Sequence, residues 1–197
     1  MTVVTGRVLY LVGGPPRVGK SALAQRLVRS QAIPWLPADV LRTVLRRVVA
    51  ELDTVDSDPV DAERLAEVMY PHIEQAAEVC AEEAERFLIE GFELAPWYPA
   101  RLQAALPGVQ IRACFLGHRS FCADDLAAYQ GPKPQHEREA SHAELTAAAA
   151  WIRRRSHQLA EQCRTAGVAY LDVGERSFES TMQRARLHRM KPTTNHA

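Results

Sequence analysis

Gly14-Pro15-Pro16-Arg17-Val18-Gly19-Lys20-Ser21 matches the pattern G-x-x-x-x-G-K-[S/T]. The apolar run Val8–Val12 precedes this stretch, and an amphipathic segment begins at Lys20, so the loop joins a predicted strand to a predicted helix. In that setting backbone N–H groups surround phosphate oxygens, the helix N-terminus favours negative charge, Lys20 reaches the terminal phosphates and Ser21 is a ligand for Mg²⁺. The stretch, with Ala22 as the next helical residue, therefore predicts a nucleotide phosphate site, and we expect ATP and Mg²⁺ as its cofactors.

Two prolines distinguish this loop. Neither Pro15 nor Pro16 has a backbone N–H group, so the donors to phosphate must come from the segment 18–21. The fixed φ angles of the prolines also predict a stiff loop.

Composition limits the classes of partner. The chain has 197 residues, with 24 basic and 24 acidic side chains, so no net field attracts nucleic acid or an acidic membrane surface. Its length predicts one domain over residues 1–189, followed by a flexible tail over 190–197. Four cysteines without C-x-x-C spacing favour a reducing cytoplasm, and no apolar run is long enough to span a membrane. We expect a small-molecule substrate and a monomer or homodimer.

Short apolar runs alternate with longer amphipathic segments along the chain. This alternation predicts an α/β fold with a five-stranded parallel sheet and helices on both faces. The expected strands are Val8–Val12, Ile33–Leu36, Phe87–Ile89, Val109–Leu116 and Val168–Asp172. The expected helices are Lys20–Gln31, Val40–Leu52, a long one capped by Asp58 with Pro59 at its first position, Pro99–Leu106, Ser120–Tyr129, Glu139–Ala166 and Phe178–Arg189. Pro71 should kink or divide the third helix.

Asp39 is the first candidate for contact with a phosphoryl acceptor. It closes the second predicted strand, at the sheet edge where open α/β proteins bind ligands. It could equally cap the following helix. Arg42 and Arg46, at successive turns of that helix, could hold an anionic acceptor or could form a solvated basic face.

Glu90 and Gly91 follow a buried strand, Phe87–Ile89. An acid there can lie near Mg²⁺ or the acceptor, and a glycine permits close approach to the backbone. The alternative for Glu90 is a rim carboxylate paired with an arginine. Asp172 also ends a strand, but that strand is the last in the chain, so we rank Asp172 below Glu90.

Three further groups complete the predicted site. Arg155 falls on the apolar stripe of a long helix, so it could neutralise charge on the transferring phosphoryl group or form a buried structural ion pair. Lys133 and Arg138 lie in and after the helix-breaking segment 130–135, which predicts a lid. Trp97, just beyond Glu90, could line an acceptor pocket, although packing is the more usual role of such an aromatic residue.

The P-loop, Ala38-Asp39-Val40-Leu41-Arg42 and Leu88-Ile89-Glu90-Gly91-Phe92-Glu93-Leu94, read together, resemble the 2-phosphoglycerate kinase-like P-loop kinases. More distantly, the chain is similar to the shikimate, gluconate, chloramphenicol and zeta-toxin kinase branch. The resemblance implies the strand order 2-3-1-4-5 and contact between Asp39 and the acceptor hydroxyl. It also implies an adenine pocket, whose positions here are His118, Arg119, Gly174 and Arg176. The short lid departs from the arginine cluster of many relatives.

These features predict an ATP-dependent phosphotransferase that moves the γ-phosphoryl group to a hydroxyl of a small polar or anionic molecule. Lys20, Asp39 and Arg155 are its expected catalytic residues. A nucleoside or nucleotide kinase is the alternative enzyme, favoured if Arg42 and Arg46 bind a nucleoside phosphate. A non-catalytic nucleotide-binding regulator is the alternative from another class.

Overall fold

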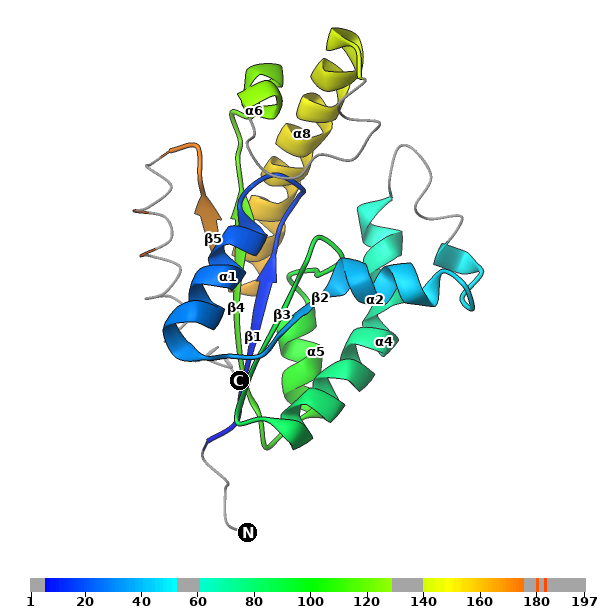
Figure 1. The fold of residues 1–197 in the computed structure, drawn as a ribbon, viewed down its shortest axis with the longest axis vertical. Coiled ribbons are helices and arrows are strands. Elements are labelled where there is room, and N and C mark those ends of the chain that lie inside the picture. The colour runs from blue at the N-terminus through cyan, green and yellow to red at the C-terminus, as the bar shows by residue number, and fades with distance from the viewer. Residues whose placement is uncertain (1–5, 53–60, 129–139, 176–179, 181–182, 184–197) are drawn as a thin grey trace.

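The computed structural model describes residues 6–52, 61–128, 140–175, 180 and 183 (Figure 1). The predicted five-stranded parallel sheet forms its centre, and its strand order, β2-β3-β1-β4-β5, is the one that the resemblance implies. The strands are β1 (Val8–Gly13), β2 (Trp35–Pro37), β3 (Arg86–Gly91), β4 (Gln110–Gly117) and β5 (Ala169–Asp172). The helices are α1 (Lys20–Gln31), α2 (Ala38–Leu45), α4 (Ala62–Glu83), α5 (Tyr98–Ala105), α6 (Ala123–Ala128) and α8 (His142–Ala166).

The strand register brings distant sequence motifs to one edge of the sheet. Gly13, the last residue of β1, pairs with Gly91 of β3, and Glu90 pairs with both Val12 of β1 and Pro37 of β2. Because all strands are parallel, the loops that follow them leave from the same edge. The P-loop, Asp39 and Glu90 therefore lie at adjacent positions of the sheet.

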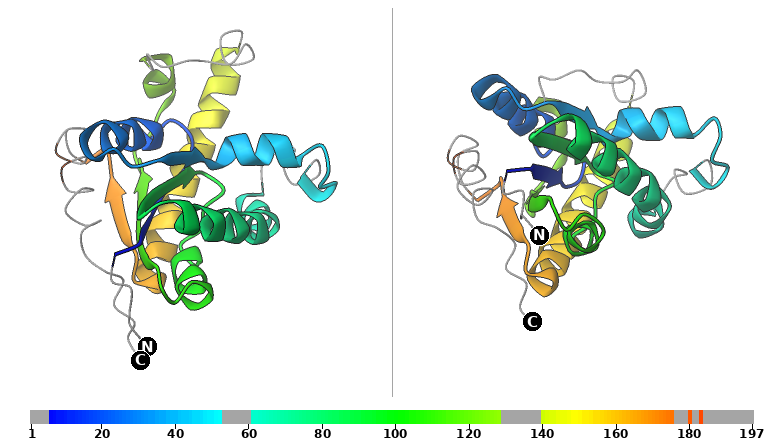
Figure 2. Two further views of the ribbon diagram at one scale, coloured as in Figure 1. Left: turned by 60° about the horizontal axis from the view of Figure 1, so that its bottom comes forward. Right: turned by 90° about the horizontal axis from the view of Figure 1, so that it is seen from below.

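Side chains that alternate along β1 build two cores. Leu9 and Leu11 belong to the cluster that includes α4 and α5, whereas Tyr10 and Val12 belong to the cluster that includes α1 and α6. This alternation is the period of two that a strand buried on both faces requires. Helix α8 contributes to both clusters, and Figure 2 shows it running along one side of the sheet.

The start of the chain follows the sequence prediction closely, but the next elements differ. Helix α1 has the predicted bounds, whereas β2 begins and ends later than expected and α2 begins at Ala38 and ends at Leu45. After α2, the N–H groups of Arg47 and Val48 donate to carbonyls three residues earlier. This spacing is that of a 3₁₀ turn, which ends the α-helix. The prediction of a helix to Leu52 was therefore too long.

Helix α4 begins later than predicted and continues through its proline. Its N-cap is Asp61, which accepts a hydrogen bond from Arg64 N at 3.0 Å, so Asp58 is not its cap. Pro71 does not divide the helix, which continues to Glu83. Helix α8 starts after Ser141, later than the predicted Glu139, and ends at Ala166 with Gly167 as its C-cap, as predicted.

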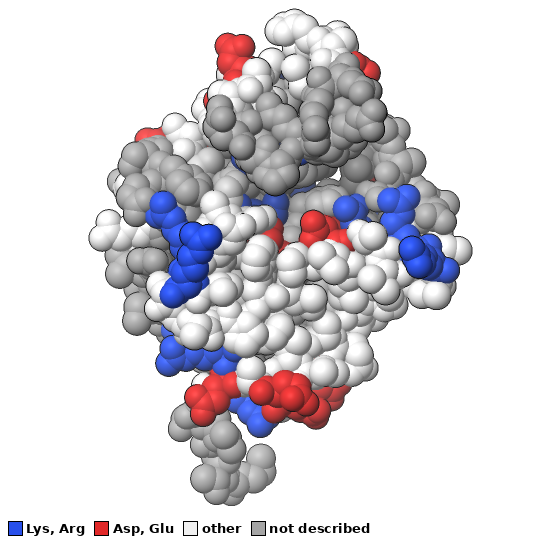
Figure 3. All heavy atoms as spheres, viewed as in Figure 1, with Lys and Arg blue, Asp and Glu red and all other residues white. Residues whose placement is uncertain are grey.

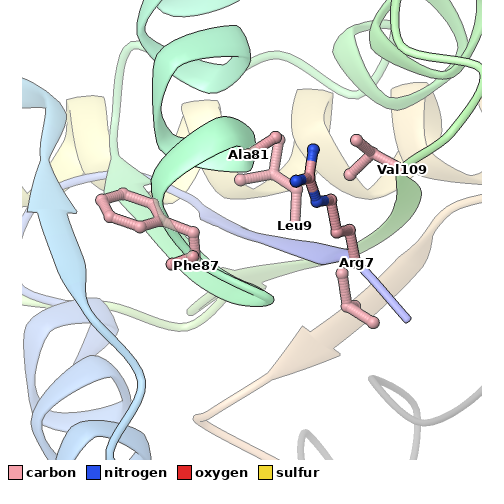
Figure 4. Close-up of a pocket in the computed structure, with 7 residues that line it drawn as sticks. Arg7, Leu9, Ala81, Phe87 and Val109 are labelled. Atoms are coloured by element: carbon pink, nitrogen blue, oxygen red, sulfur yellow. The ribbon is translucent and has the colours of Figure 1, made fainter. Parts of the chain in front are cut away.

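A small pocket lies at the opposite edge of the sheet from the P-loop (Figure 4). It is lined by residues at the amino-terminal ends of the central strands and by α4: Arg7, Val8, Leu9, Ala81, Ala84, Phe87 and Val109. Apart from the guanidinium of Arg7 the side chains are apolar, so the pocket offers few groups for chemistry. None of the helices in the described part of the chain is long and apolar enough to cross a membrane.

Candidate active site

The P-loop uses left-handed backbone at three positions. Gly14 has φ 137°, Arg17 has φ 67° and Gly19 has φ 89°. A Cβ on Gly14 would overlap the carbonyl oxygen of Leu116 in β4, so glycine is required there by contact as well as by φ. The loop thus turns sharply between β1 and α1 and aims the N-terminus of α1 into the site.

Lys20 is held inside this loop. Its side chain is buried, and Nζ donates to the carbonyl oxygen of Pro15 at 2.8 Å. Burial lowers the pKa of Lys20, while the charges of Glu90, Glu93 and Asp39 act in the opposite direction. The lysine therefore lies within electrostatic range of three carboxylates from two other strand ends.

Ser21 and Glu90 face each other across the sheet edge. The Ser21 hydroxyl lies 3.3 Å from Glu90 Oε2 and 3.4 Å from Oε1. Glu90 is buried, and burial raises its pKa, whereas Lys20 and the Ser21 hydroxyl lower it. This agrees with the predicted place of Glu90 beside the P-loop.

The donor set fits Mg²⁺. One hydroxyl and one carboxylate are hard oxygen donors, and neighbouring oxygens in an octahedral Mg²⁺ shell are about 3 Å apart. Residues 6–52, 61–128 and 140–175 contain no group of three or more His, Cys, Asp or Glu side chains arranged to hold a metal. A Mg²⁺ ion with few protein ligands completes its shell with phosphate oxygens and water, which is how this ion is usually bound beside nucleotides.

Asp39 lies in the first turn of α2 and is exposed. The N-cap of α2 is Pro37, so Asp39 is not the cap; its Oδ1 accepts a hydrogen bond from the next N–H group, of Val40, at 2.9 Å. Its charge acts on both Lys20 and Glu90. The sheet edge thus brings the predicted acceptor carboxylate to the predicted phosphate site.

Arg42 does not belong to a solvated basic face. Its side chain is only 16% exposed, its Nε lies 3.0 Å from Glu93 Oε1, and its guanidinium carbon lies 4.9 Å from the centre of the Phe92 ring. Arg46, one turn later, is exposed.

Glu93 is a site residue that sequence reasoning missed. It is completely buried, and its charge is felt at Lys20. The available signal was the spacing of two acids in Glu90-Gly91-Phe92-Glu93. Gly91, predicted to permit close approach, is approached by the Glu93 carboxylate and by Ala38 Cβ, which a Cβ on Gly91 would meet at 2.6 Å.

Arg155 occupies the inner position predicted for it. It is 6% exposed and forms an ion pair with Glu63 of α4, Nη1 to Oε1, at 2.6 Å. Gln162 donates to the same Glu63 oxygen at 2.8 Å. A structural ion pair is therefore present, with Arg155 buried and Glu63 half-exposed. Arg155 and Glu63 line a pocket of about 250 Å³ together with Asp61, Ala62, Trp151, Arg154 and Gln158.

The turn after β4 and the loop after β5 are joined by Asp172. Its Oδ2 accepts from Arg119 Nε at 2.6 Å, and its Oδ1 accepts from Gly174 N at 2.9 Å. A Cβ on Gly174 would meet the His118 ring at 2.6 Å. Three of the four positions predicted for an adenine pocket thus lie together, while Arg176 lies outside the described residues.

Trp97 packs against two other aromatic side chains, those of Tyr70 and Tyr98. Its ring centre lies 4.5 Å from that of Tyr98 and 5.1 Å from that of Tyr70, and the Arg101 guanidinium lies over it. The lid residues Lys133 and Arg138 lie outside the described residues.

On the face seen in Figure 3, acidic side chains lie in a central hollow with basic side chains on either side.

No protein-family model and no curated protein matches this sequence. Solved structures do match it. A shikimate kinase from Bacteroides thetaiotaomicron aligns with TM-score 0.55 and 17% identity, over 91% of this chain and 97% of that one. A gluconokinase from Sinorhizobium meliloti aligns with TM-score 0.57 and 15% identity, over 93% and 90% of the two chains.

The chain has the P-loop kinase fold. A third structure, of a Chloroflexus aurantiacus protein described as a kinase, aligns with TM-score 0.54 and 16% identity over 94% of this chain and 97% of that one. Two of these neighbours, the shikimate kinase and the gluconokinase, are named for substrates that also name the more distant kinase branch that the sequence resembles. The nearer resemblance, to 2-phosphoglycerate kinase-like proteins, stays a prediction.

Proposed function

We propose that the protein transfers the γ-phosphoryl group of ATP, in the presence of Mg²⁺, to a hydroxyl of a small polar or anionic molecule. The observation that carries this proposal is the contact between Ser21 and Glu90 beside the buried Lys20, together with the pairing of Glu90 with Pro37, two residues before Asp39. A phosphate loop alone would support nucleotide binding. The additional carboxylate on α2, within electrostatic range of that loop, supports a bound acceptor.

Each residue has a role that follows from its chemistry. Lys20 and the backbone N–H groups of 18–21 hold the β- and γ-phosphates. Ser21 and Glu90 would hold Mg²⁺, which neutralises phosphate charge when bound. Asp39 orients the acceptor hydroxyl and takes its proton as the oxygen bonds to the γ-phosphorus and the bond to the β-phosphate oxygen breaks, releasing ADP.

The remaining predicted residues belong to the same proposal. Lys133 screens charge on the transferring group, with Arg138 as a further lid residue, because the Arg155 guanidinium is already paired with Glu63. Arg119 and Arg176 bind the base, and Arg46 borders the acceptor. The two neighbours named as kinases of hydroxy acids favour a polar or anionic acceptor over an apolar one.

A mass-shift screen tests this function. Purified protein is incubated with Mg²⁺, ATP and a panel of sugars, hydroxy acids, nucleosides, nucleotides and antibiotics, and a gain of one phosphoryl group identifies the acceptor. Phosphorylation of nucleosides or nucleotides alone would favour the alternative enzyme. Absence of product from every class, with ATP binding intact, would favour the regulator and contradict the proposal.

Variants then test the roles. Asp39→Asn should lower kcat by about 10²-fold or more while ATP affinity changes by less than about threefold, because only the acceptor hydroxyl loses its partner. Asp124→Asn is the matched control, since Asp124 is also an exposed aspartate in the first turn of a helix. Lys20→Met should weaken ATP binding itself. Unchanged turnover in Asp39→Asn would remove Asp39 from the mechanism.

A further inference from the structure

Arg17 has a backbone conformation that residues other than glycine rarely adopt. Its φ is 67°, in the left-handed region, where a Cβ is crowded by the following peptide group. The phosphate loop has two further left-handed positions, Gly14 and Gly19, and glycine occupies both of them. Strain of this kind lowers stability and is concentrated at functional sites. The arginine side chain at this position therefore needs an explanation that the backbone does not supply.

The residues on either side of Arg17 hold its backbone in place. Pro15 and Pro16 precede it, and each proline ring fixes its own φ angle. Val18 follows it and is buried in the core cluster that also contains Leu23 of α1. Relaxing the backbone at Arg17 would move the prolines or this core. The strained conformation is therefore a fixed part of the phosphate loop.

The charge of Arg17 acts on Lys20, the lysine of the same loop. Burial lowers the pKa of Lys20 most, and the positive charge of Arg17 lowers it further. The Nε atom of Arg17 is shielded from solvent, so water screens this interaction less than it would at an open surface. Two cations that repel each other in the empty protein attract an anion together, and binding of the anion relieves the repulsion. Arg17 and Lys20 thus favour a multiply charged anion in the loop.

We propose that Arg17 is a catalytic residue whose guanidinium binds the phosphates of ATP and stabilises the charge that develops as the γ-phosphoryl group leaves. This inference rests on the proposed phosphotransferase function and adds a residue to its phosphate site. A guanidinium offers paired N–H groups that match phosphate oxygens, whereas the ammonium of Lys20 is a point charge.

The transfer step gives this cation a place to act. The acceptor oxygen bonds to the γ-phosphorus and its proton goes to Asp39, while the bond from the γ-phosphorus to the β-phosphate oxygen breaks. Negative charge therefore grows on the β-phosphate of the departing ADP. Arg17 belongs to the loop that binds this phosphate, so its charge is present there before the reaction begins.

Substitution by glycine separates a functional role of Arg17 from a structural one. Arg17→Gly removes the guanidinium and also relieves the backbone strain. Ala32→Gly is the matched control, because Ala32 is a non-glycine C-cap of α1 with φ 50°. Without nucleotide, we expect Ala32→Gly to unfold about 2–4 °C above the wild type and Arg17→Gly no lower than the wild type. With saturating Mg²⁺, calorimetry should show ATP bound about tenfold more weakly by Arg17→Gly alone. Unchanged ATP affinity in Arg17→Gly would overturn the proposal.

Two further variants separate the charge from the backbone. Arg17→Ala keeps the strained backbone without the charge and should weaken ATP binding as Arg17→Gly does. Arg17→Lys keeps a charge without the paired N–H groups and should recover part of the loss. Arg29→Ala is the control for net charge, because Arg29 is exposed in the last turn of α1, about 13.5 Å along the helix from Lys20 and beyond the screening length of about 8 Å at physiological salt. Equal weakening of ATP binding by Arg29→Ala would reduce the effect to net charge and overturn the contact.

Turnover measures the part of the role that belongs to the transition state. With an acceptor from the mass-shift screen and saturating ATP, Arg17→Ala should lower kcat about 10²-fold and change the KM of the acceptor by less than about threefold. A rise in the acceptor KM with kcat and ATP affinity unchanged would overturn the phosphate role. If the wild type phosphorylates no compound, the phosphotransferase function fails, and about tenfold weaker ATP binding by Arg17→Ala still supports Arg17 as a phosphate ligand.

Discussion

The Ser21 hydroxyl lies 3.3 Å from Glu90 Oε2, although Ser21 is the second residue of α1 and Glu90 is the last residue but one of β3. The parallel pairing of β1 with β3 creates this relationship, because it places Val12 beside Glu90 just before the P-loop begins. Two oxygen donors of the kind that Mg²⁺ prefers therefore meet beside the phosphate loop.

Removing either donor should raise the Mg²⁺ requirement. We expect Ser21→Ala and Glu90→Gln each to raise the Mg²⁺ concentration for half-maximal ATP binding by about tenfold, because a hard oxygen ligand is lost or loses its charge. Titration of Mg²⁺ at fixed ATP, followed by calorimetry, measures this. Ser21→Thr keeps the hydroxyl and serves as the control. A Glu90→Gln protein with the wild-type Mg²⁺ dependence would exclude Glu90 from the metal site.

Adding one methyl group at Gly91 should destabilise the folded protein. In Gly91→Ala the new Cβ would overlap the Glu93 carboxylate and approach Ala38 Cβ to 2.6 Å, so we expect a loss of about 1–3 kcal/mol in the free energy of unfolding. Gly108→Ala is the control, since no atom lies within 4 Å of a Cβ at that position. Urea denaturation of both variants measures the difference. Equal stability of Gly91→Ala and Gly108→Ala would show that the space between Gly91, Glu93 and Ala38 can accommodate a methyl group.

The buried Glu93 should make stability depend on pH. Burial raises the pKa of Glu93, with Asp39 acting in the same direction and Arg42 and Lys20 in the opposite one; Tyr98 also lies within electrostatic range. The folded state thus holds this proton more tightly than the unfolded chain does. The Glu93 contribution to the free energy of unfolding is present below the ordinary carboxyl pKa and is lost as pH rises through the raised one.

Glu93→Gln cannot ionise, so its free energy of unfolding should fall less than that of the wild type between about pH 4 and pH 7. Urea denaturation of the Mg²⁺-free proteins at several pH values tests this. A constant difference between wild type and variant across that range would contradict it.

The Glu63–Arg155 pair should respond asymmetrically to mutation. Glu63→Gln leaves the buried Arg155 cation without its charged partner, whereas Arg155→Met leaves a half-exposed carboxylate that water can solvate. We therefore expect Glu63→Gln to destabilise more, by about 1 kcal/mol given the exposure of Glu63. Thermal unfolding compares them, with exposed Arg154→Met as the control. Greater destabilisation by Arg155→Met would indicate that packing of the arginine stem dominates.

Thiol labelling should separate the four cysteines. Cys122 is exposed, Cys114 and Cys163 are buried, and burial raises the pKa of Cys163 to about 12. Because the thiolate is the reactive form, Cys122 should react first with a thiol reagent, and Cys114 and Cys163 only on unfolding. Mass spectrometry of labelled peptides identifies the sites. Rapid labelling of Cys163 in the native protein would contradict this packing.

Local patterns predicted much of the fold because they depend on neighbouring residues. The P-loop with its flanking strand and helix follows from spacing and periodicity, and α1 has the predicted bounds. Helix α4 shows the limit: Asp58 was predicted as its cap, whereas Asp61 is the residue whose side chain accepts from Arg64 N. Pro71 was expected to kink or divide the helix; the helix is not divided, and Met69 and Ile73 on either side of Pro71 are buried in the core.

The site was predicted less completely because burial is a tertiary property. Glu93 is an acid in a loop after a strand, and such acids are usually solvated. Only the missing Cβ of Gly91 and the guanidinium of Arg42 explain its burial. The ion pair with Glu93 also explains why Arg42 is largely buried. Helical periodicity alone did not distinguish a buried Arg42 from one on a solvated basic face.

The contact between Ser21 and Glu90 spans 69 residues of sequence, so it also has a kinetic meaning. Closing that long loop comes late compared with forming α1, because non-local strand pairing is slow. Partly folded chains would have the P-loop sequence but lack half of the metal site. Mg²⁺ and ATP should then recognise only the completed sheet and shift the folding equilibrium toward it by mass action.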